Sequence, residues 1–326
     1  METSDIGFSG QRTPNPRCRV CDSVKIKLKG VKRGRFVDAD FYFYDCLDCG
    51  FLFVDPITDV NVYNDAYYAG HGIDPLVNYQ EEYTKYASTA RRFEFEDFVR
   101  FAQNHLSRSD VSAFSGKGHV SWLDFGCGAG GLLKYLRISK LLTCDGRQIA
   151  VHPVGQDIGS YAERLKRDDG FEILDWDELS QLPPGRFDII TCIEVIEHVP
   201  NPWSVIELLA RNLKEGGLLI LTTGNLDSPL AKLQGIKFGY CVPEIHISLL
   251  TPKLLERLYR KAGLAPIRLR YYGSIKFRFL KNLRRIRGGE LLVRLANFRL
   301  ILRLADWVFG VSAMPSAFKP VSRYCG

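Results

Sequence analysis

A glycine-rich turn between an apolar run and a helical pattern is the feature that most restricts the fold of this chain. Residues 120–125 (VSWLDF) form a short, largely apolar run with Asp124 near its end, residues 126–131 read GCGAGG, and residues 132–136 (LLKYL) continue at helical spacing. A strand, a tight glycine turn and a helix let backbone amides approach a nucleotide ligand closely. The turn lacks both the Gly-Lys-Ser/Thr of a phosphate-binding loop and the usual dinucleotide spacing. The pattern therefore predicts an α/β fold. Its ligand is expected to carry an ammonium group, because the Asp124 carboxylate would repel a pyrophosphate.

Four further landmarks follow the glycine turn in a fixed order. They are residues 155–158 (GQDI), 187–199 (FDIITCIEVIEHV), 213–222 (LKEGGLLILT) and 246–264, which begin HISLLTP and end AGL. With residues 123–130 (LDFGCGAG), these segments resemble the class I S-adenosylmethionine (SAM)-dependent methyltransferases over about residues 118–272. The resemblance implies a Rossmann-like, seven-stranded core, SAM as the cofactor and methyl transfer as the activity.

The same resemblance implies which residues hold the cofactor. Gly126, Gly128 and Gly130 would lie beside its methionine portion, with Asp124 near the loop. Asp157, after the second strand, would accept both ribose hydroxyls, because a carboxylate offers paired acceptors.

The spacing from the glycine turn to Asp157 is longer than usual for this fold and implies an insertion over residues 138–150. Asp145 stands at a more ordinary distance, but its turn-like surroundings (TCDGRQ) favour Asp157. Asp175 and Trp176 follow the third predicted strand and are candidates for the adenine, and Glu194 after the fourth strand is a candidate contact of cofactor or acceptor.

Two Cys-x-x-Cys pairs precede the core. Cys18 and Cys21 are separated from Cys46 and Cys49 by 24 residues of polar and alternating sequence that suits a hairpin. Paired thiolates complete the tetrahedral set that Zn²⁺ prefers, and four Cys ligands leave no open position, so the sequence predicts a structural zinc site. The alternative is four buried cysteines without a metal.

Four parts are expected along the chain: a zinc ribbon over residues 1–60, an aromatic and helical connecting segment over 61–117, the methyltransferase core over 118–272, and a basic helical insertion with a last strand over 273–326. In the connecting segment, the tyrosine-rich residues 61–80 suit either a cover over a pocket or a packed linker, and a helix is predicted over 81–106. The sixth strand is predicted over 266–272 and the last strand over 307–313.

Methyl transfer requires alignment, a dry pocket and, for a hydroxyl acceptor, a base. Histidine titrates in the useful range. His198 follows the fourth strand at the edge where ligands gather, and His246 lies in a segment that resembles the substrate side of the family. Both are candidate bases, and each has a structural histidine as its alternative.

Positive charge is concentrated near the end of the chain. Of 44 Lys and Arg residues, 14 lie in residues 261–326, where only Glu290 and Asp306 oppose them. Residues 276–303 mix these charges with apolar residues as amphipathic helices do, which fits either contact with an anionic membrane surface or a helical cap with a solvated charged face. The cap is the favoured interpretation. Without a secretory signal or a spanning apolar run, the expected location is cytoplasmic, with peripheral contact at the inner membrane face as the alternative.

Three functions compete. The paired cysteines resemble the ribbon that precedes this core in bacterial methyltransferases of sugar and surface-polysaccharide pathways, which predicts a small-molecule saccharide acceptor, nucleotide- or lipid-linked. An RNA methyltransferase is the alternative, but the mixed charge of the ribbon and the absence of an Asn/Asp-Pro-Pro-aromatic signature disfavour a nucleic-acid partner. A non-catalytic SAM-binding module is disfavoured by the intact glycine loop.

Overall fold

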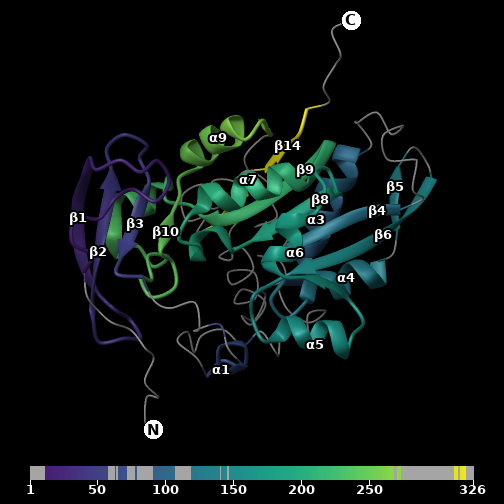
Figure 1. Cartoon of the computed structure of the whole chain (residues 1–326), viewed down its shortest axis with the longest axis horizontal. Helices are drawn as coiled ribbons and strands as arrows, with labels where there is room; N and C mark the ends of the chain where they lie inside the picture. Colours follow the sequence, from purple (N-terminus) through teal and green to yellow (C-terminus); the bar gives the residue numbers. More distant parts are fainter. Residues whose placement is uncertain are drawn as a thin grey trace, which may run out of the picture.

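Two β-sheets and the helices around them make up the described part of this computed structural model (Figure 1). The structure describes residues 12–57, 63, 65–71, 78, 91–106, 119–139, 141–144, 147–267, 270–272, 312–314 and 316–320. Asp145 and the basic segment 276–303 lie outside these residues.

Parallel strands form the centre of the larger sheet. They are β4 (His119–Phe125), β6 (Arg147–Gln156), β7 (Glu172–Leu174), β8 (Phe187–Ile193) and β9 (Leu213–Gly224). β4 pairs with β6 on one side and β8 on the other, β7 continues beyond β6, and β9 continues beyond β8. The chain thus builds outward in one direction and then in the other, and ligands bind at such a switch point outside the carboxyl ends of the strands.

An antiparallel edge completes this sheet beside β9. β14 (Ser316–Phe318) lies between β9 and β11 (Ala265–Pro266), and β13 (Ser312–Met314) pairs with both β9 and β12 (Arg270–Tyr272). The sixth strand over 266–272 is confirmed as two short strands, β11 and β12.

Of the last strand predicted over 307–313, residues 307–311 lie outside the described residues, and residues 312 and 313 are confirmed as part of β13. A further strand, β14, follows the predicted end. Ser316 and Ala317 are fully buried against β9 but are too small and too weakly apolar to mark a strand in sequence.

The predicted insertion between the glycine turn and Asp157 is confirmed. β5 (Leu141–Cys144) turns back antiparallel to the start of β6, which lengthens the segment without displacing the end of β6. Asp157 therefore follows the last residue of that strand directly.

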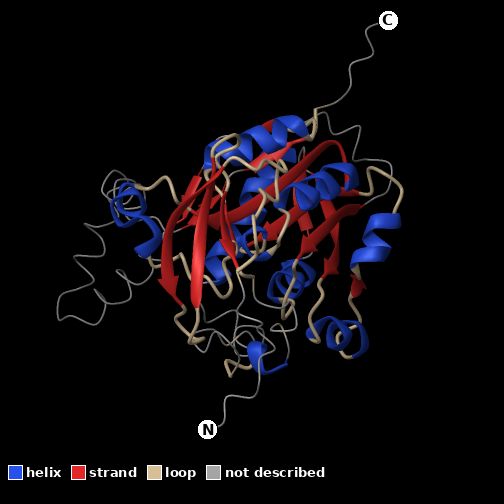
Figure 2. Ribbon diagram, turned by 60° about the vertical axis from the view of Figure 1, so that its left-hand side comes forward, coloured by secondary structure: helices blue, strands red, loops and turns tan. Residues whose placement is uncertain are grey.

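Helices cover both faces of the larger sheet (Figure 2). Leu123 and Phe125 pack with α7 (Pro202–Asn212) and α9 (Pro252–Lys261), whereas Trp122 packs with α3 (Arg91–Leu106) and α4 (Gly131–Ser139). Shorter helices are α1 (Asp65–Tyr68), α5 (Tyr161–Arg167), α6 (Trp176–Gln181), α8 (Pro229–Gln234), η4 (Ile196–His198) and η5 (Gly235–Lys237). The described part of the helix predicted over 81–106 is confirmed as α3. Among the residues that the structure describes, no helix is long and apolar enough to cross a membrane.

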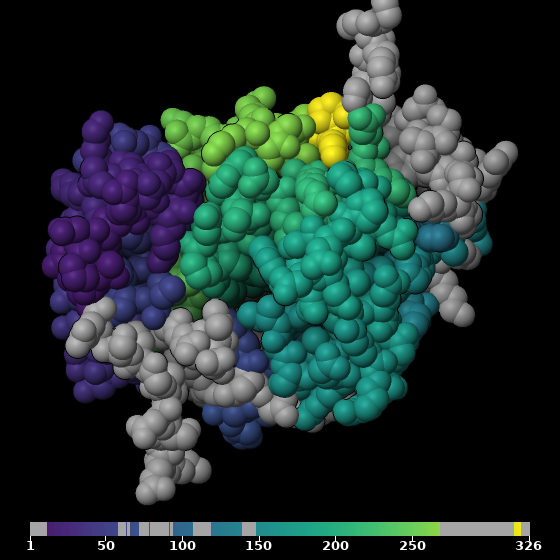
Figure 3. Space-filling view, viewed as in Figure 1, coloured from purple at the N-terminus to yellow at the C-terminus, as the bar shows by residue number. Residues whose placement is uncertain are grey.

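The smaller sheet joins the N-terminal segment to the core. β1 (Ile26–Arg33), β2 (Asp40–Cys46) and β3 (Leu52–Asp55) are antiparallel, and β10 (Ser248–Leu249), far along the chain, pairs with β3 as a fourth strand. The hairpin predicted between the two cysteine pairs is confirmed as β1 and β2. In Figure 3 the purple N-terminal residues pack directly beside the teal and green core.

Candidate functional site

A cavity of about 250 Å³ opens beside the switch point between β4 and β8. Its walls come from the glycine turn, the residues after β6, the exit of β8, and tyrosines of the connecting segment. Polar and aromatic side chains from distant parts of the sequence meet in it, which makes it the candidate functional site.

The glycine turn has a backbone that only glycine adopts without strain. Gly126, Gly128 and Gly130 have φ of +71°, +52° and +75°. A Cβ at Gly126 would collide with Val195, and one at Gly130 would come within 2.6 Å of Leu165. A Cβ at Gly128 would meet only Tyr68, at 3.8 Å, so Gly128 faces open space. Gly126 and Gly128 line the cavity, whereas Gly130 serves the packing behind it.

Asp157 links the glycine turn to the start of the next helix. Its carboxylate accepts hydrogen bonds from the backbone N–H of Gly128 and of Gly159, both at 2.7 Å, and from the Tyr68 hydroxyl at 3.2 Å. The side chain is half-buried on the cavity wall. The structure therefore brings Asp157 and the turn together as the sequence predicts, and adds Tyr68 as a hydroxyl donor to the same carboxylate.

Asp124 is a buried acid at the base of the cavity. It is 4% exposed and accepts a 2.8 Å hydrogen bond from the Thr191 hydroxyl. Burial raises the pKa of Asp124 to about 7. A cationic ligand beside it would favour the ionised carboxylate, which fits the ammonium group expected from the sequence.

Of the two candidates for binding the adenine, Trp176 lines the cavity and Asp175 does not. Trp176 lines the cavity, half exposed, with its ring edge-on to Phe125 at 6.2 Å between centroids. Asp175 is the N-cap of α6: it accepts from the Glu178 N–H at 2.7 Å, while Glu178 bonds back to the Asp175 N–H. Asp175 is not among the residues that line the cavity.

The Tyr240 hydroxyl bridges two acids, the half-buried Glu194 and the fully buried Glu197. Tyr240 Oη lies 2.9 Å from Glu194 Oε2 and in hydrogen-bond contact with Glu197 Oε1, and Glu197 also accepts from Thr223 at 2.9 Å. A phenol carries one proton and cannot donate to both acids, so one carboxyl group must itself be protonated. Burial and the charge of Glu197 raise the pKa of Glu194 to about 8. Glu194 lines the cavity with φ of +52°, a strained backbone found mainly where function requires it.

Replacing Glu194 with Gln should make stability less dependent on pH. An acid with a raised pKa binds more protons in the folded state, so its stabilising contribution is lost as pH rises from about 4.5 to about 8. Gln keeps a donor toward Tyr240 without that loss. Between about pH 5 and about pH 8 the Glu194→Gln variant should gain roughly 2–6 °C in Tm relative to the parent. Thermal unfolding in matched buffers measures this, and parallel Tm curves for the two proteins would contradict it.

The two candidate bases lie in edge-to-face contact, with ring centroids 5.0 Å apart. His198 Nδ1 lies 2.8 Å from the Ile245 carbonyl and His246 Nδ1 lies 2.5 Å from the Tyr240 carbonyl. A carbonyl only accepts, so each Nδ1 carries a proton and each Nε2 is an acceptor. Burial lowers the pKa of His198 to about 4 and of His246 to about 3, so both rings are neutral at pH 7. His198 lines the cavity, whereas the His246 ring stacks on Tyr240 behind it.

His198 and His246 also bring potential metal-ligating atoms within 4.8 Å of those of Glu197. However, both oxygens of Glu197 already accept hydrogen bonds from protein hydroxyls. Each of the three residues thus has its own protein hydrogen-bond partners: Glu197 bonds to Tyr240 and Thr223, His198 to the Ile245 carbonyl, and His246 to the Tyr240 carbonyl.

Tyrosines of the connecting segment cover the cavity, as one of the two sequence interpretations predicts. Tyr63, Tyr67 and Tyr68 all line it, and neighbouring pairs pack edge to face. Tyr63 also lies 3.0 Å from His198 Nδ1. Sequence reasoning missed Tyr240 and Phe95, because nothing local signals that a loop tyrosine reaches the acids after β8 or that a helix residue reaches the cavity.

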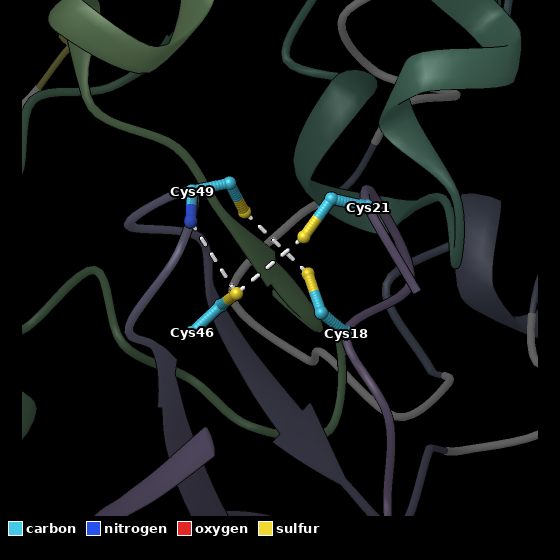
Figure 4. A group of neighbouring side chains, drawn as sticks. All are labelled: Cys18, Cys21, Cys46 and Cys49. Atoms are coloured by element: carbon cyan, nitrogen blue, oxygen red, sulfur yellow. Dashed lines mark hydrogen bonds between the residues drawn. The ribbon is translucent and has the colours of Figure 1, made fainter. Parts of the chain in front are cut away.

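The four N-terminal cysteines form a second candidate site. Their sulfur atoms point toward one another (Figure 4): Cys18 and Cys21 come from the turn before β1, Cys46 from the last residue of β2, and Cys49 from the turn that follows. Cys18 and Cys49 Sγ are 3.5 Å apart, and Cys21 and Cys46 Sγ are 3.6 Å apart. Tetrahedral Zn–S bonds of about 2.3 Å imply sulfur separations of about 3.8 Å. The donor set and its spacing therefore fit a metal ion.

Strand order, glycine turn and cavity together define a Rossmann-like class I methyltransferase domain. A family model described as a methyltransferase domain matches residues 68–269, well over half of the chain. The chain belongs to this methyltransferase family.

Curated relatives include proteins named ubiquinone biosynthesis O-methyltransferase. The Dechloromonas aromatica protein is 39% identical over 103 residues, which are 32% of this chain and 44% of that protein. The Burkholderia pseudomallei protein is 29% identical over 155 residues (45% and 66%), and the Methylococcus capsulatus protein 28% over 196 residues (56% and 80%). The chain thus spans less than two thirds of the length of the first two relatives.

Solved structures that are similar to this chain at a low level include methyltransferases. A SAM-dependent methyltransferase from Archaeoglobus fulgidus is 18% identical with a TM-score of 0.42, covering 70% of this chain and 99% of that one. A putative sarcosine dimethylglycine methyltransferase from Galdieria sulphuraria is 17% identical with a TM-score of 0.42, covering 68% and 86%.

Proposed function

We propose that this protein transfers the methyl group of SAM to a hydroxyl oxygen of a small, ring-containing molecule. The observation that carries the proposal is that one cavity holds the glycine turn, Asp157 and a neutral His198. The names of the curated relatives support oxygen as the methylated atom.

The residues present fit SAM. Gly128 presents open backbone to the cavity, the buried Asp124 suits an ammonium group, and Asp157 suits hydroxyl donors because it already accepts the Tyr68 hydroxyl. Trp176 offers an exposed ring for the adenine. When bound, SAM supplies an electrophilic methyl group on its sulfonium.

His198 performs the proton step in this proposal. Its Nε2 accepts the hydroxyl proton of the acceptor as the oxygen becomes nucleophilic. The Ile245 carbonyl, which accepts from Nδ1–H, then stabilises the imidazolium that forms. His246 lies behind His198 as a second neutral ring and remains the alternative base.

Aromatic side chains favour a ring in the acceptor. Tyr63, Tyr67, Tyr68 and Phe95 supply apolar ring faces and hydroxyl groups around the cavity. Such surfaces pack against a phenolic ring and also against the apolar face of a sugar. The saccharide acceptor that the cysteine segment suggests therefore remains one of the two candidate classes.

A direct assay separates these acceptor classes. The protein is incubated with labelled SAM and phenols, nucleotide sugars, a lipid-linked saccharide or RNA, and products are identified by mass spectrometry. We expect an O-methylated phenol or sugar. Methyl transfer only to carbon, nitrogen or RNA would contradict the proposal.

We also propose that Cys18, Cys21, Cys46 and Cys49 hold one structural Zn²⁺. Protein purified without chelator should contain about one zinc per chain by elemental analysis, and Cys21→Ser should lose most of it. Because metal binding contributes folding free energy, the variant should also show a lower Tm. A metal-free parent after expression with added zinc would contradict this.

A further inference from the structure

Loop 240–248, the segment that ends at the first residue of β10, supplies the groups that hold the candidate catalytic side chains. The Tyr240 hydroxyl bridges Glu194 and Glu197. The Ile245 carbonyl fixes the proton of His198 on Nδ1. The position of this loop therefore decides which nitrogen of His198 can accept a proton.

The N-terminal sheet holds the same loop from its other side. Lys32 on β1 donates to the Cys241 carbonyl at 2.5 Å. The N–H groups of Phe36 and Val37, between β1 and β2, donate to Glu244 Oε1 at 2.6 and 3.2 Å. Glu244 is fully buried, so this contact forms away from water.

Arg19, which lies between Cys18 and Cys21, makes a third contact with loop 240–248; these contacts are called ties below. The Arg19 guanidinium donates to the Ile247 carbonyl at 2.6 Å and to the Val54 carbonyl at 3.1 Å. It also lies over the Phe53 ring, 5.1 Å from its centroid.

Apolar packing reinforces these ties. Residues of β2 and β3 share one buried cluster with residues of loop 240–248: Phe41, Phe43, Leu52 and Val54 with Tyr240, Cys241 and Ile247. The Val54 N–H also donates to the Ile247 carbonyl at 3.0 Å, and β10 continues the sheet from there.

We propose that the N-terminal sheet positions the acceptor side of the active site. Glu244, Arg19 and Lys32 are the positioning residues, and they act through loop 240–248. This inference rests on the proposed role of His198. The sheet is thereby assigned to catalysis through positioning rather than to binding a separate macromolecule. Losing a tie would let the Ile245 carbonyl shift, and His198 would then populate the tautomer with its proton on Nε2, which cannot accept the acceptor's proton.

A pair of variants at Glu244 tests this. Glu244→Ala removes the acceptor for Phe36 and Val37, whereas Glu244→Gln keeps it. We expect Glu244→Ala to lower kcat by about 10- to 100-fold with the Kd for SAM within about threefold, because small misplacements of a reacting group have effects of this size. Glu244→Gln should restore kcat. Nitrogen NMR of labelled histidine should show His198 protonated on Nδ1 in the parent and Gln proteins, and a mixture of tautomers in the Ala protein.

Two further variants keep the test decisive. Lys32→Met keeps the apolar stem at a partly exposed site and should shift the His198 tautomer and kcat in the same direction even if Glu244→Ala fails to fold. Asp188→Asn alters an equally buried acid on β8 of the larger sheet, which accepts from the Ser121 N–H and from Lys214. This variant should lower Tm without moving the tautomer. An unchanged His198 tautomer in both Lys32→Met and Glu244→Ala, or an equal shift in Asp188→Asn, would overturn the inference. SAM binding and the NMR signal need no methyl transfer, so a failed acceptor assay would count against the proposed function alone.

Discussion

Replacing His198 with Ala should lower kcat by about 10²- to 10⁴-fold, the range that general base catalysis contributes. His198 lines the cavity and is neutral, and the Ile245 carbonyl leaves its Nε2 as the acceptor. Ala removes that nitrogen but leaves the glycine turn and Asp157 in place. The Kd for SAM should therefore change by less than about threefold, so the loss falls on kcat. Single-turnover methyl transfer with saturating SAM measures it.

Two other histidines provide the controls for this experiment. His246→Ala removes a ring that stacks on Tyr240 behind the cavity wall and should lower kcat less, by about tenfold. His152→Ala alters an exposed residue of β6 that pairs with Glu172, outside the cavity, and should leave kcat unchanged. A His198→Ala enzyme within about threefold of the parent would remove His198 from the mechanism, and a larger loss in His246→Ala would transfer the role of base to His246.

Replacing Asp157 with Ala should weaken SAM binding by about 10- to 100-fold, since hydrogen bonds to a charged group contribute roughly 1.5–3 kcal/mol. The carboxylate both fixes Gly128 and Gly159 through their N–H groups and presents an acceptor to the cavity. Ala removes the ligand contact and frees the turn. Calorimetric titration of SAM into parent and variant gives the two Kd values.

Asp175→Ala is the matched control. Asp157 and Asp175 each directly follow a strand, and the sequence predicts both as cofactor residues. Asp175 caps α6 and accepts from Glu178 outside the cavity. Its loss should lower stability by about 1 kcal/mol and leave the Kd for SAM within about twofold. Equal effects of the two substitutions on SAM affinity would contradict the assignment of Asp157.

The parts of the fold that the sequence predicts are those set by local pattern. β4, the glycine turn and α4 are contiguous, and each step has its own signal in apolar spacing or glycine content. The paired cysteines also carry a local signal, because the Cys-x-x-Cys spacing turns the two sulfur atoms of each pair toward one point. Asp157 directly follows β6 and Trp176 lies two residues after the end of β7, so both are predicted from their places at the ligand-binding edge of the sheet.

The remainder depends on contacts between residues far apart in sequence. β10 completes the N-terminal sheet with only two residues, which follow β3 by about 200 residues. Tyr240 reaches Glu194 and Glu197 after β8 across 46 and 43 residues. Neither leaves a periodic signal. Asp175 differs, because the acid three residues before Glu178 at the start of a helix is a capping-box pattern that could have been read from sequence.

Calorimetric titration of SAM into the purified parent protein tests the central claim most directly, namely that the cavity beside the glycine turn is a SAM site. We predict one SAM bound per chain with a Kd in the micromolar to sub-millimolar range typical of enzyme substrates, and competition by its demethylated product. A folded parent protein that gives no binding heat at several temperatures and no rise in Tm with millimolar SAM would contradict the account.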